Sequence, residues 1–396
     1  MMDDSSLSPG SAPRVSVYTR DEDSAGVIRQ ALSELGGAEA VFKSDGLSAA
    51  LADLSGRQSP RLLIVDLSGD PDPTARVREL IGMCEPSTSV LAIGDVNDIR
   101  LYRNIREAGA TEYFFKPLVT ALVARTCRSV LTGVQEASHQ RTGRLVFVVG
   151  VRGGCGATTI GVRTAYRLSE SPPRPVLMLD LDLQSGDAAL QLDATPNHAL
   201  PEALAQTERV DDLFLERGLI RVTGRLDLMA SLEPLDVSPS LDEDALLALM
   251  DKLARRYRYV VADVPGAQAA SLSRVLHTPG TLLLVSDGRL ASAREVARWR
   301  QWLGVNSAER NVLHILNMQG APGSLSPEEF ARAAGQAPDV VIPYAREVAA
   351  TSLMGLKARP DCPTLDRGLE PVISMLSGGG SSSGHPRKSI LERVLG

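Results

Sequence analysis

The segment VFVVGVRGGCGATT, residues Val146–Thr159, constrains the fold of this chain more than any other feature. A short apolar run ends in a loop that is rich in glycine, and the helix-like segment Ile160–Leu168 follows. A strand that leads through such a loop into a helix N-terminus is typical of phosphate binding, because glycines let successive backbone N–H groups converge on an anion. Taken alone, the loop is also compatible with a tight turn that binds nothing.

Three further apolar runs each end in a polar residue. They are Val176–Leu179 before Asp180-Leu-Asp182, Tyr259–Ala262 before Asp263, and Leu313–Leu316 before Asn317. Acidic groups at the C-terminal ends of parallel strands face the crevice where an α/β sheet binds its ligand. Beside a phosphate loop, carboxylates hold metal-bound waters and orient an attacking water, as a Mg²⁺-nucleotide requires. Any one of these aspartates also suits a helix cap or a turn, but the set favours a nucleotide site.

The C-terminal two thirds of the chain, roughly Leu145–Leu376, resembles the ParA/MinD group of deviant P-loop ATPases. Within that group it is most similar to the CpaE/TadZ proteins of Tad (Flp) pilus assembly. The family loop KGGxGKTT corresponds to Arg152–Thr159. The run LDLDLQSGDAALQLD, Leu179–Asp193, matches the CpaE/TadZ branch closely and is more specific than the loop.

The resemblance implies ATP and Mg²⁺ as cofactors, and it assigns roles to single residues. Asp180 and Asp182 correspond to the second acidic motif, and Asp263 corresponds to the Walker B aspartate. The implied metal contacts are Thr158, Asp180 and Asp263, and Asp182 would orient water. The implied nucleotide contacts are Gly153, Gly154, Cys155, Gly156, Ala157, Thr158, Thr159 and, at the adenine-contacting strand end, Asn317.

Two positions depart from the family loop. Arg152 replaces a lysine that reaches the partner's phosphates in a nucleotide-sandwich dimer, and arginine keeps a trans phosphate contact chemically possible. Ala157 replaces the lysine that contacts the phosphates in cis, a variant found in the CpaE/TadZ branch. Loss of one preorganised charge-stabilising donor costs about 2.7–4 kcal/mol, on the order of a hundred- to thousandfold in rate. We therefore expect ATP binding with slow or negligible hydrolysis. Cys155 is expected to be inert, although a helix N-terminus can lower the pKa of a nearby thiol.

The N-terminal third alternates strand-like and helix-like segments, which predicts a small doubly wound domain. The strand-like runs are Arg14–Tyr18, Ala40–Phe42, Leu62–Val65, Val90–Ile93 and Glu112–Phe115. Helix-like segments between them include Val27–Leu35, Arg76–Met83 and Ile99–Ala108.

The end of this region, AGATEYFFKPL (Ala108–Leu118), resembles the last unit of response-regulator receivers. Asp66 then falls where the phospho-acceptor would be. Receiver chemistry is incomplete, because Asp21-Glu22-Asp23 begins two residues beyond the expected end of the first strand and Gly94 replaces a hydroxyl residue. A docking module is favoured over phosphorylation of Asp66. CpaE/TadZ proteins carry such an atypical receiver, so the two parts of the chain support one identification.

Composition bounds the domain organisation. The chain has 396 residues and 43% apolar content, enough for two cores. We expect a disordered segment 1–13, a receiver-like domain 14–132, a linker 133–143, an ATPase domain 144–376, and a tether with a short tail 377–396. The four scattered cysteines suit a reducing cytoplasm. No apolar run reaches the length of a membrane span, and the net charge of −6 makes nucleic-acid binding an unexpected function.

The tail predicts a weak membrane or partner contact. In PRKSILERVLG, the apolar side chains Ile390, Leu391, Val394 and Leu395 share one helical face, flanked by basic residues. The segment Arg387–Leu395 resembles the membrane-targeting C-terminus of MinD proteins, and basic amphipathic helices bind anionic interfaces. A short helix that docks on a partner or folds back is the alternative.

The sequence as a whole predicts two doubly wound α/β domains, a flavodoxin-like receiver and a P-loop NTPase with a mostly parallel sheet. The expected function is that of an ATP-binding, homodimerising localisation factor for a Tad-type pilus apparatus. It would be cytoplasmic, either free or peripheral on the inner face of the cell membrane. The alternative is a septum-site or partition-type ATPase that cycles on membrane or DNA by hydrolysis. A reductase on the same fold is set aside, because the cysteines provide no cluster-binding pair.

Overall fold

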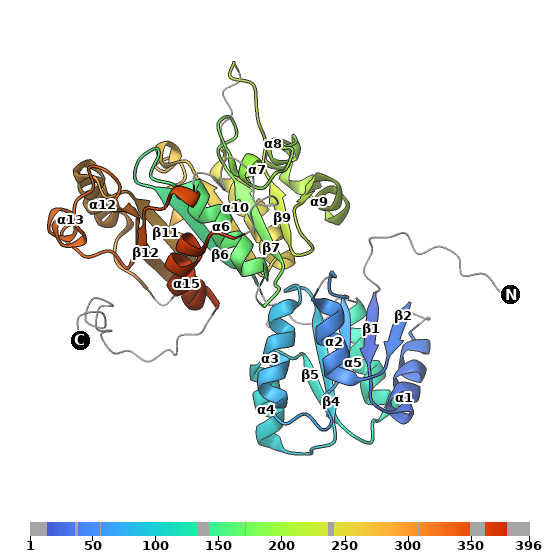
Figure 1. Cartoon of the computed structure of the whole chain (residues 1–396). Helices are drawn as coiled ribbons and strands as arrows, with labels where there is room; N and C mark the ends of the chain where they lie inside the picture. Colours follow the sequence, from blue (N-terminus) through green and yellow to red (C-terminus); the bar gives the residue numbers. More distant parts are fainter. Residues whose placement is uncertain are drawn as a thin grey trace, which may run out of the picture.

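The computed structural model describes residues 14–35, 39–55, 57–132, 142–170, 172–236, 241–307, 309–348 and 361–377. These residues form two α/β domains, each built on its own sheet (Figure 1). The predicted N-terminal segment 1–13, most of the predicted linker and the tail with Arg387–Leu395 lie outside the described residues.

The N-terminal domain has a five-stranded parallel sheet in the order β2-β1-β3-β4-β5. Its strands are β1 Val15–Tyr18, β2 Ala40–Lys43, β3 Leu62–Asp66, β4 Ser89–Gly94 and β5 Glu112–Phe115. β1 and β3 are buried along their whole length, as expected of central strands covered on both faces. This strand order is the flavodoxin-like one, so the predicted fold class of this domain is confirmed.

Five helices cover the two faces of this sheet. They are α1 Glu22–Ser33, α2 Gly46–Leu54, α3 Pro73–Met83, α4 Ile99–Glu107 and α5 Thr120–Thr132. The apolar faces of α1 and α5 pack in one core cluster, and those of α2, α3 and α4 pack in the other. Aspartates at the N-caps of α1, α3 and α4 accept backbone N–H groups of the first turn, which explains why these helices begin where they do.

The C-terminal domain has an eight-stranded sheet in the order β13-β12-β11-β6-β10-β7-β9-β8. All of its pairings are parallel except that of β8 with β9. The strands are β6 Arg144–Gly150, β7 Val176–Asp180, β8 Ile220–Arg221, β9 Leu226–Met229, β10 Tyr259–Val264, β11 Gly280–Ser286, β12 Arg310–Gln319 and β13 Val340–Pro343. The central strand β6 leads into the glycine-rich loop, so this loop lies at the middle of the sheet.

Helices cover both faces of the large sheet. They are α6 Ala157–Glu170, α7 Ala188–Gln191, α8 Ala199–Ala205, α9 Asp212–Gly218, α10 Glu243–Arg256, α11 Ser273–Leu276, α12 Leu290–Leu303, α13 Pro327–Ala334 and α15 Pro363–Ser377, with short 3₁₀ turns η2 Thr207–Arg209 and η3 Gly266–Gln268. α6, α7 and α15 share one core cluster with the sheet, while α8 to α13 pack in the other. Two ion pairs, Arg163–Asp366 and Arg167–Glu370, join α6 to α15.

Candidate functional site

The glycine-rich loop joins β6 to α6 at the C-terminal edge of the large sheet. Its backbone is left-handed at Gly154 (φ 78°) and Gly156 (φ 86°), a conformation in which a Cβ atom is strained. A Cβ atom on Gly156 would also lie 2.5 Å from Nδ2 of Asn317, whereas one on Gly153 or Gly154 would meet nothing within 4 Å. The outer side of the loop is therefore open. Together with the first turn of α6, whose amides lack intrahelical acceptors, it forms a cradle of backbone donors.

Two buried side chains support this loop from the sheet. Asn317 Nδ2 donates to the carbonyl oxygen of Cys155 at 3.0 Å, and Cys155 Sγ donates to the carbonyl oxygen of Val285 at 3.3 Å. Burial raises the pKa of the Cys155 thiol, which agrees with the expectation of an inert cysteine. The carboxamide of Asn317, expected at the nucleotide base, contacts the loop backbone here.

The strand-end aspartates Asp180 and Asp263 lie beside this loop. They pair in register on the neighbouring strands β7 and β10, and both are buried. The Thr158 hydroxyl, in the first turn of α6, lies near the Asp263 carboxylate and lowers its pKa. Asp180 accepts the backbone N–H groups of Asp182 at 3.1 Å and Ala188 at 3.2 Å. The fold thus brings three predicted site residues, one hydroxyl and two carboxylates, to one point.

The ionised forms of the two buried carboxylates are electrostatically unfavourable. Burial and the neighbouring Asp263 raise the pKa of Asp180 to about 7. Burial likewise raises the pKa of Asp263 to about 6, against the opposing effect of the nearby Thr158 hydroxyl. No lysine or arginine among the described residues forms an ion pair with either carboxylate. Negative charge here has no internal partner, a situation that a bound cation relieves.

Asp182 follows Asp180 by two residues and is half-buried. Its carboxylate accepts the backbone N–H groups of Gln184 at 3.3 Å and Ser185 at 2.9 Å, so it shapes the turn that follows β7. Gly186 is required in that turn, because a Cβ atom there would lie 2.4 Å from Oδ2 of Asp180. A second glycine, Gly266, brings the segment after β10 against the loop, since its Cβ would lie 2.6 Å from the carbonyl oxygen of Gly150. Both close approaches were missed from the sequence, although each glycine follows a strand-end aspartate by a few residues.

The two departures from the usual phosphate loop occupy different environments. The Arg152 side chain is exposed at the outer side of the loop. Ala157, the first residue of α6, packs its methyl group against the core cluster of α6 and α15. The position that would carry a lysine in cis therefore contributes only an apolar contact. Thr159 is half-buried in the first turn of α6.

The N-terminal domain contains a second acidic site at the C-terminal edge of its sheet. Asp66 ends β3 and is fully buried. Lys116 Nζ donates to Asp66 at 2.7 Å and to Asp21 at 2.5 Å. Burial opposes ionisation of Asp66, but hydrogen bonds from Lys116 and from the Ser68 and Arg20 backbone hold its pKa below the ordinary value. The sequence placed Asp66 at the expected phospho-acceptor position, and Asp21 beyond the expected end of the first strand. In the structure Lys116 hydrogen-bonds to both aspartates.

Tyr113 fills the space beside Gly94, the position expected to carry a hydroxyl residue in a receiver. A Cβ atom on Gly94 would lie 2.7 Å from the tyrosine oxygen, and the tyrosine hydroxyl donates to the carbonyl oxygen of Val96 at 2.8 Å. The Arg20 side chain extends close to Gly46 and Gly69, which border the Asp66 end of β3. Neither Tyr113 nor Arg20 was singled out from the sequence.

A metal cage made by the protein alone is absent from the described ranges, where no three His, Cys, Asp or Glu side chains are placed to enclose an ion. A cation at Asp180 and Asp263 would need further oxygen ligands, such as the Thr158 hydroxyl. Within the same ranges, no helix has the length and apolar character needed to cross a bilayer.

Neither a protein-family model nor a curated protein sequence matches the chain. Among solved structures, a ParA family ATPase from Chlorobium tepidum TLS is 21% identical, with a TM-score of 0.52 over 60% of this chain and 98% of its own. The septum site-determining protein MinD of Pyrococcus horikoshii OT3, complexed with Mg-ADP, is 22% identical, with a TM-score of 0.47 over 60% and 95%. A putative CpaE2 pilus assembly protein from Sinorhizobium meliloti 1021 is 26% identical, with a TM-score of 0.28 over 29% and 98%. The first of these similarities shows that the C-terminal domain has the fold of the ParA family ATPases.

Proposed function

We propose that this protein is an ATP-binding, dimerising localisation or assembly factor for a Tad-type pilus apparatus, with weak or no ATP hydrolysis. One observation supports it above all others. Two buried carboxylates, Asp180 and Asp263, meet the Thr158 hydroxyl beside an open cradle of backbone N–H groups, and they have no cationic partner among the described residues. This donor set fits a Mg²⁺-nucleotide, in which the metal offsets both the carboxylates and the phosphates.

Separate parts of the site would hold separate parts of the nucleotide. The loop from Gly153 to Thr159 would bind phosphate oxygens through its amides, and Thr158 with Asp180 and Asp263 would hold the metal. Asn317 keeps the loop in shape through its hydrogen bond to Cys155. Mg²⁺ would supply charge neutralisation at the phosphates. Asp182 is the proposed water-orienting group.

Slow hydrolysis follows from the charge balance of the loop. Ala157 offers an apolar contact where a cis lysine would stabilise the charge that develops on transfer. The exposed Arg152 is available to a second copy of the chain, and its planar guanidinium suits bidentate phosphate contact. A homodimer that closes over two nucleotides would therefore bind tightly while turning over slowly.

The N-terminal domain is proposed to act as an atypical receiver that docks on partners rather than one that is switched by phosphorylation. Its Asp66 is buried and already bonded to Lys116. Exposed large apolar side chains lie where β4 and β5 lead into α4 and α5: Val96, Ile99, Phe115, Val119 and Leu122. The resemblance of Leu179–Asp193 to CpaE/TadZ proteins is what points to pilus components as partners. A peripheral position on the inner face of the cell membrane remains part of this proposal.

The test is a titration with Mg²⁺-ATP in which affinity, particle size and phosphate release are measured on the same samples. The wild type is expected to bind ATP, to double in mass and to release phosphate slowly. Arg152→Ala should keep ATP binding and lose the mass increase, and Asp182→Ala should keep both while losing residual turnover. Binding without any change in mass would overturn the dimer switch. Rapid turnover in the wild type would favour the alternative, a septum-site or partition-type ATPase.

A further inference from the structure

The two domains contact each other through the N-terminal edges of their sheets (Figure 1). On the C-terminal domain this edge includes Arg225, directly before β9, and Arg256, which ends α10 before β10. On the N-terminal domain it includes the C-terminal ends of α2 and α3, which precede β3 and β4. The phosphate-type loop and Asp66 lie at the opposite, C-terminal edges, so neither site is covered by this contact.

Arg225 of the C-terminal domain forms hydrogen bonds across this contact. Its side chain is buried, and Nη1 donates to the carbonyl oxygen of Met83 at 3.1 Å while Nε approaches the carbonyl oxygen of Ser55 at 3.5 Å. Both acceptors belong to the N-terminal domain. Burial lowers the pKa of the Arg225 guanidinium.

The two carbonyl groups that Arg225 reaches are helix ends. Met83 is the last residue of α3, and Ser55 directly follows α2. The last carbonyls of a helix lack intrahelical donors and carry the negative end of its dipole, so a cation is favourable there. Neither helix has a basic residue in its own last turn. The cation that both helix ends lack thus comes from the other domain.

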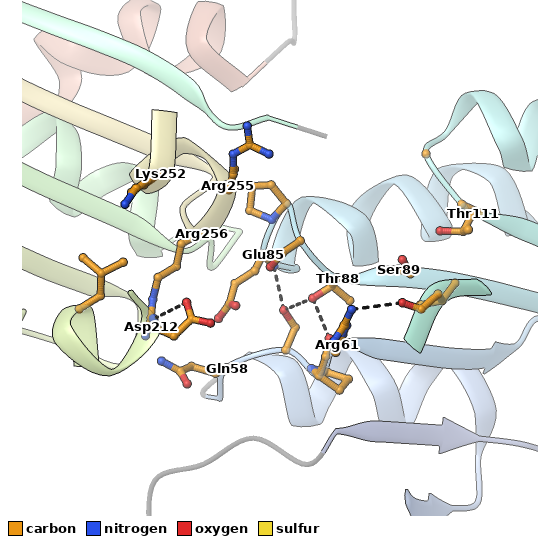
Figure 2. Close-up of a pocket in the computed structure, with 18 of the residues that line it drawn as sticks. Gln58, Arg61, Glu85, Thr88, Ser89, Thr111, Asp212, Lys252, Arg255 and Arg256 are labelled. Atoms are coloured by element: carbon orange, nitrogen blue, oxygen red, sulfur yellow. Dashed lines mark hydrogen bonds and ion pairs between the residues drawn. The ribbon is translucent and has the colours of Figure 1, made fainter. Parts of the chain in front are cut away.

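A cleft of about 1160 Å³ opens beside this contact and is lined from both domains. Figure 2 shows Glu85, from the N-terminal domain, extending toward Arg256 and Asp212 of the C-terminal domain. Arg256 pairs with Asp212 at 3.8 Å, and no direct ion pair of Glu85 is found among the described residues. The charged or titratable groups that act on Glu85 or line the adjoining small pocket are Arg221, Arg225, Asp227, Arg256 and Tyr257.

We propose that Arg225 is a latch that holds the N-terminal domain on the C-terminal domain by capping α2 and α3, and that ionisation of Glu85 loosens it. The latch fixes the N-terminal domain so that its apolar docking side chains and the nucleotide edge face away from each other. A partner bound at these apolar side chains would then sit at a defined distance from the glycine-rich loop. This inference does not depend on ATP binding.

The direction of the pH effect follows from burial. Burial raises the pKa of Glu85 to about 7, although Arg256 and Arg225 lower it. A carboxyl whose pKa is higher in the closed contact favours closure when protonated, and this contribution disappears as the pH rises through its closed-state value. Between pH 6 and pH 8, the equilibrium constant for opening the contact should rise about tenfold.

Hydrogen–deuterium exchange and small-angle scattering on the full chain test the latch. In Arg225→Met, which keeps the apolar stem, exchange of Met83–Ser89 and Thr223–Asp227 should rise at least about tenfold and the radius of gyration should increase. Exchange of Val146–Thr159 should stay as in the wild type. Arg332→Met, on the exposed side of α13, is the matched control and should change none of these quantities.

Glu85→Gln gives a second, independent readout. It should keep the closed contact at pH 8 and remove the rise in exchange seen in the wild type between pH 6 and pH 8, after correction for intrinsic exchange. Wild-type protection in Arg225→Met would overturn the latch. If Arg225→Met unfolds the C-terminal domain, as seen by circular dichroism, Glu85→Gln decides: an unchanged pH response in that variant would overturn the proposal.

Discussion

Each domain gathers two aspartates, at least one of them buried, at the C-terminal edge of a sheet, but the charges of the two sites are balanced differently. In the N-terminal domain, Lys116 bonds both Asp66 and Asp21, and the pKa of each carboxyl is lowered against the effect of burial. In the C-terminal domain, Asp180 and Asp263 have no such cation among the described residues, and the pKa of each is raised.

This difference indicates which site needs a partner. A carboxylate pair that carries its own lysine is complete, and adding charge there must first displace an existing bond. A pair without a cation gains stability from a metal ion, and the amides of the loop add affinity for phosphate. We therefore propose the acidic site of the C-terminal domain as the ligand-binding one, and the acidic site of the N-terminal domain as structural.

The sharpest way to break the comparison is to give the C-terminal site the cation that it lacks. Ala157→Lys should raise the rate of phosphate release on the order of a hundred- to thousandfold, because a preorganised charge-stabilising donor is worth about that much. Steady-state phosphate release under saturating Mg²⁺-ATP measures it.

Ala157→Met is the matched control, since methionine has comparable length without charge. It should leave phosphate release at the wild-type level. An equal rate increase in both variants would mean that packing at position 157, and not charge, limits hydrolysis.

The second prediction removes the cation from the N-terminal site. Lys116→Met should lower the free energy of unfolding by about 3 kcal/mol, because Asp66 is left buried and unpaired. Urea unfolding at pH 7 measures the loss, and Lys116→Met with Asp66→Asn should recover part of it. In the wild type, stability from the lowered pKa of Asp66 is present above its unfolded pKa and declines as the pH falls below it. A Lys116→Met variant as stable as the wild type would contradict the charge balance described for this site.

The third prediction neutralises one unpaired carboxylate. Asp263→Asn should raise the melting temperature of the nucleotide-free protein by a few degrees, since burial of an unpaired negative charge is removed. The same change should weaken the Mg²⁺ dependence of ATP binding. Thermal unfolding with and without Mg²⁺-ATP measures both effects. A lower melting temperature in the absence of ligand would show that Asp263 is already compensated.

The smallest expected effect concerns phosphorylation. Acetyl phosphate should change neither the mass nor the melting temperature of the full chain, because Asp66 is buried and bonded to Lys116. Intact-mass spectrometry measures this directly. If the wild type gained mass and the Asp66→Asn variant did not, Asp66 would be phosphorylated, which would contradict this prediction.

The sequence was sufficient for the strands that carry chemistry. Val176–Leu179, Tyr259–Ala262 and Leu313–Leu316 lie within β7, β10 and β12, because continuous apolar runs that end in a polar residue are typical of buried parallel strands. The five N-terminal strands also agree within about a residue. β8, β9, β11 and β13 were not identified, and neither were α2 and α5.

The residues of the site were predicted from the sequence, but their pairing and the lack of a cation beside them were not. Local pattern placed Asp180 and Asp263 at strand ends, yet only the sheet order makes them neighbours on β7 and β10. The bonds from Asn317 to Cys155 and from Arg225 to Met83 span more than a hundred residues, so no local pattern indicates them. Tyr113 against Gly94 is a matter of side-chain size, which becomes visible only when β4 and β5 pair.

The central claim is that the acidic site of the C-terminal domain obtains its missing positive charge from a metal–nucleotide complex. Calorimetric titration of the full chain with ATP, with and without Mg²⁺, tests this claim. Heat of binding that requires Mg²⁺ and is lost in Gly156→Val is the expected result. No heat with either form of ATP would contradict it, as would equal binding in the absence of Mg²⁺.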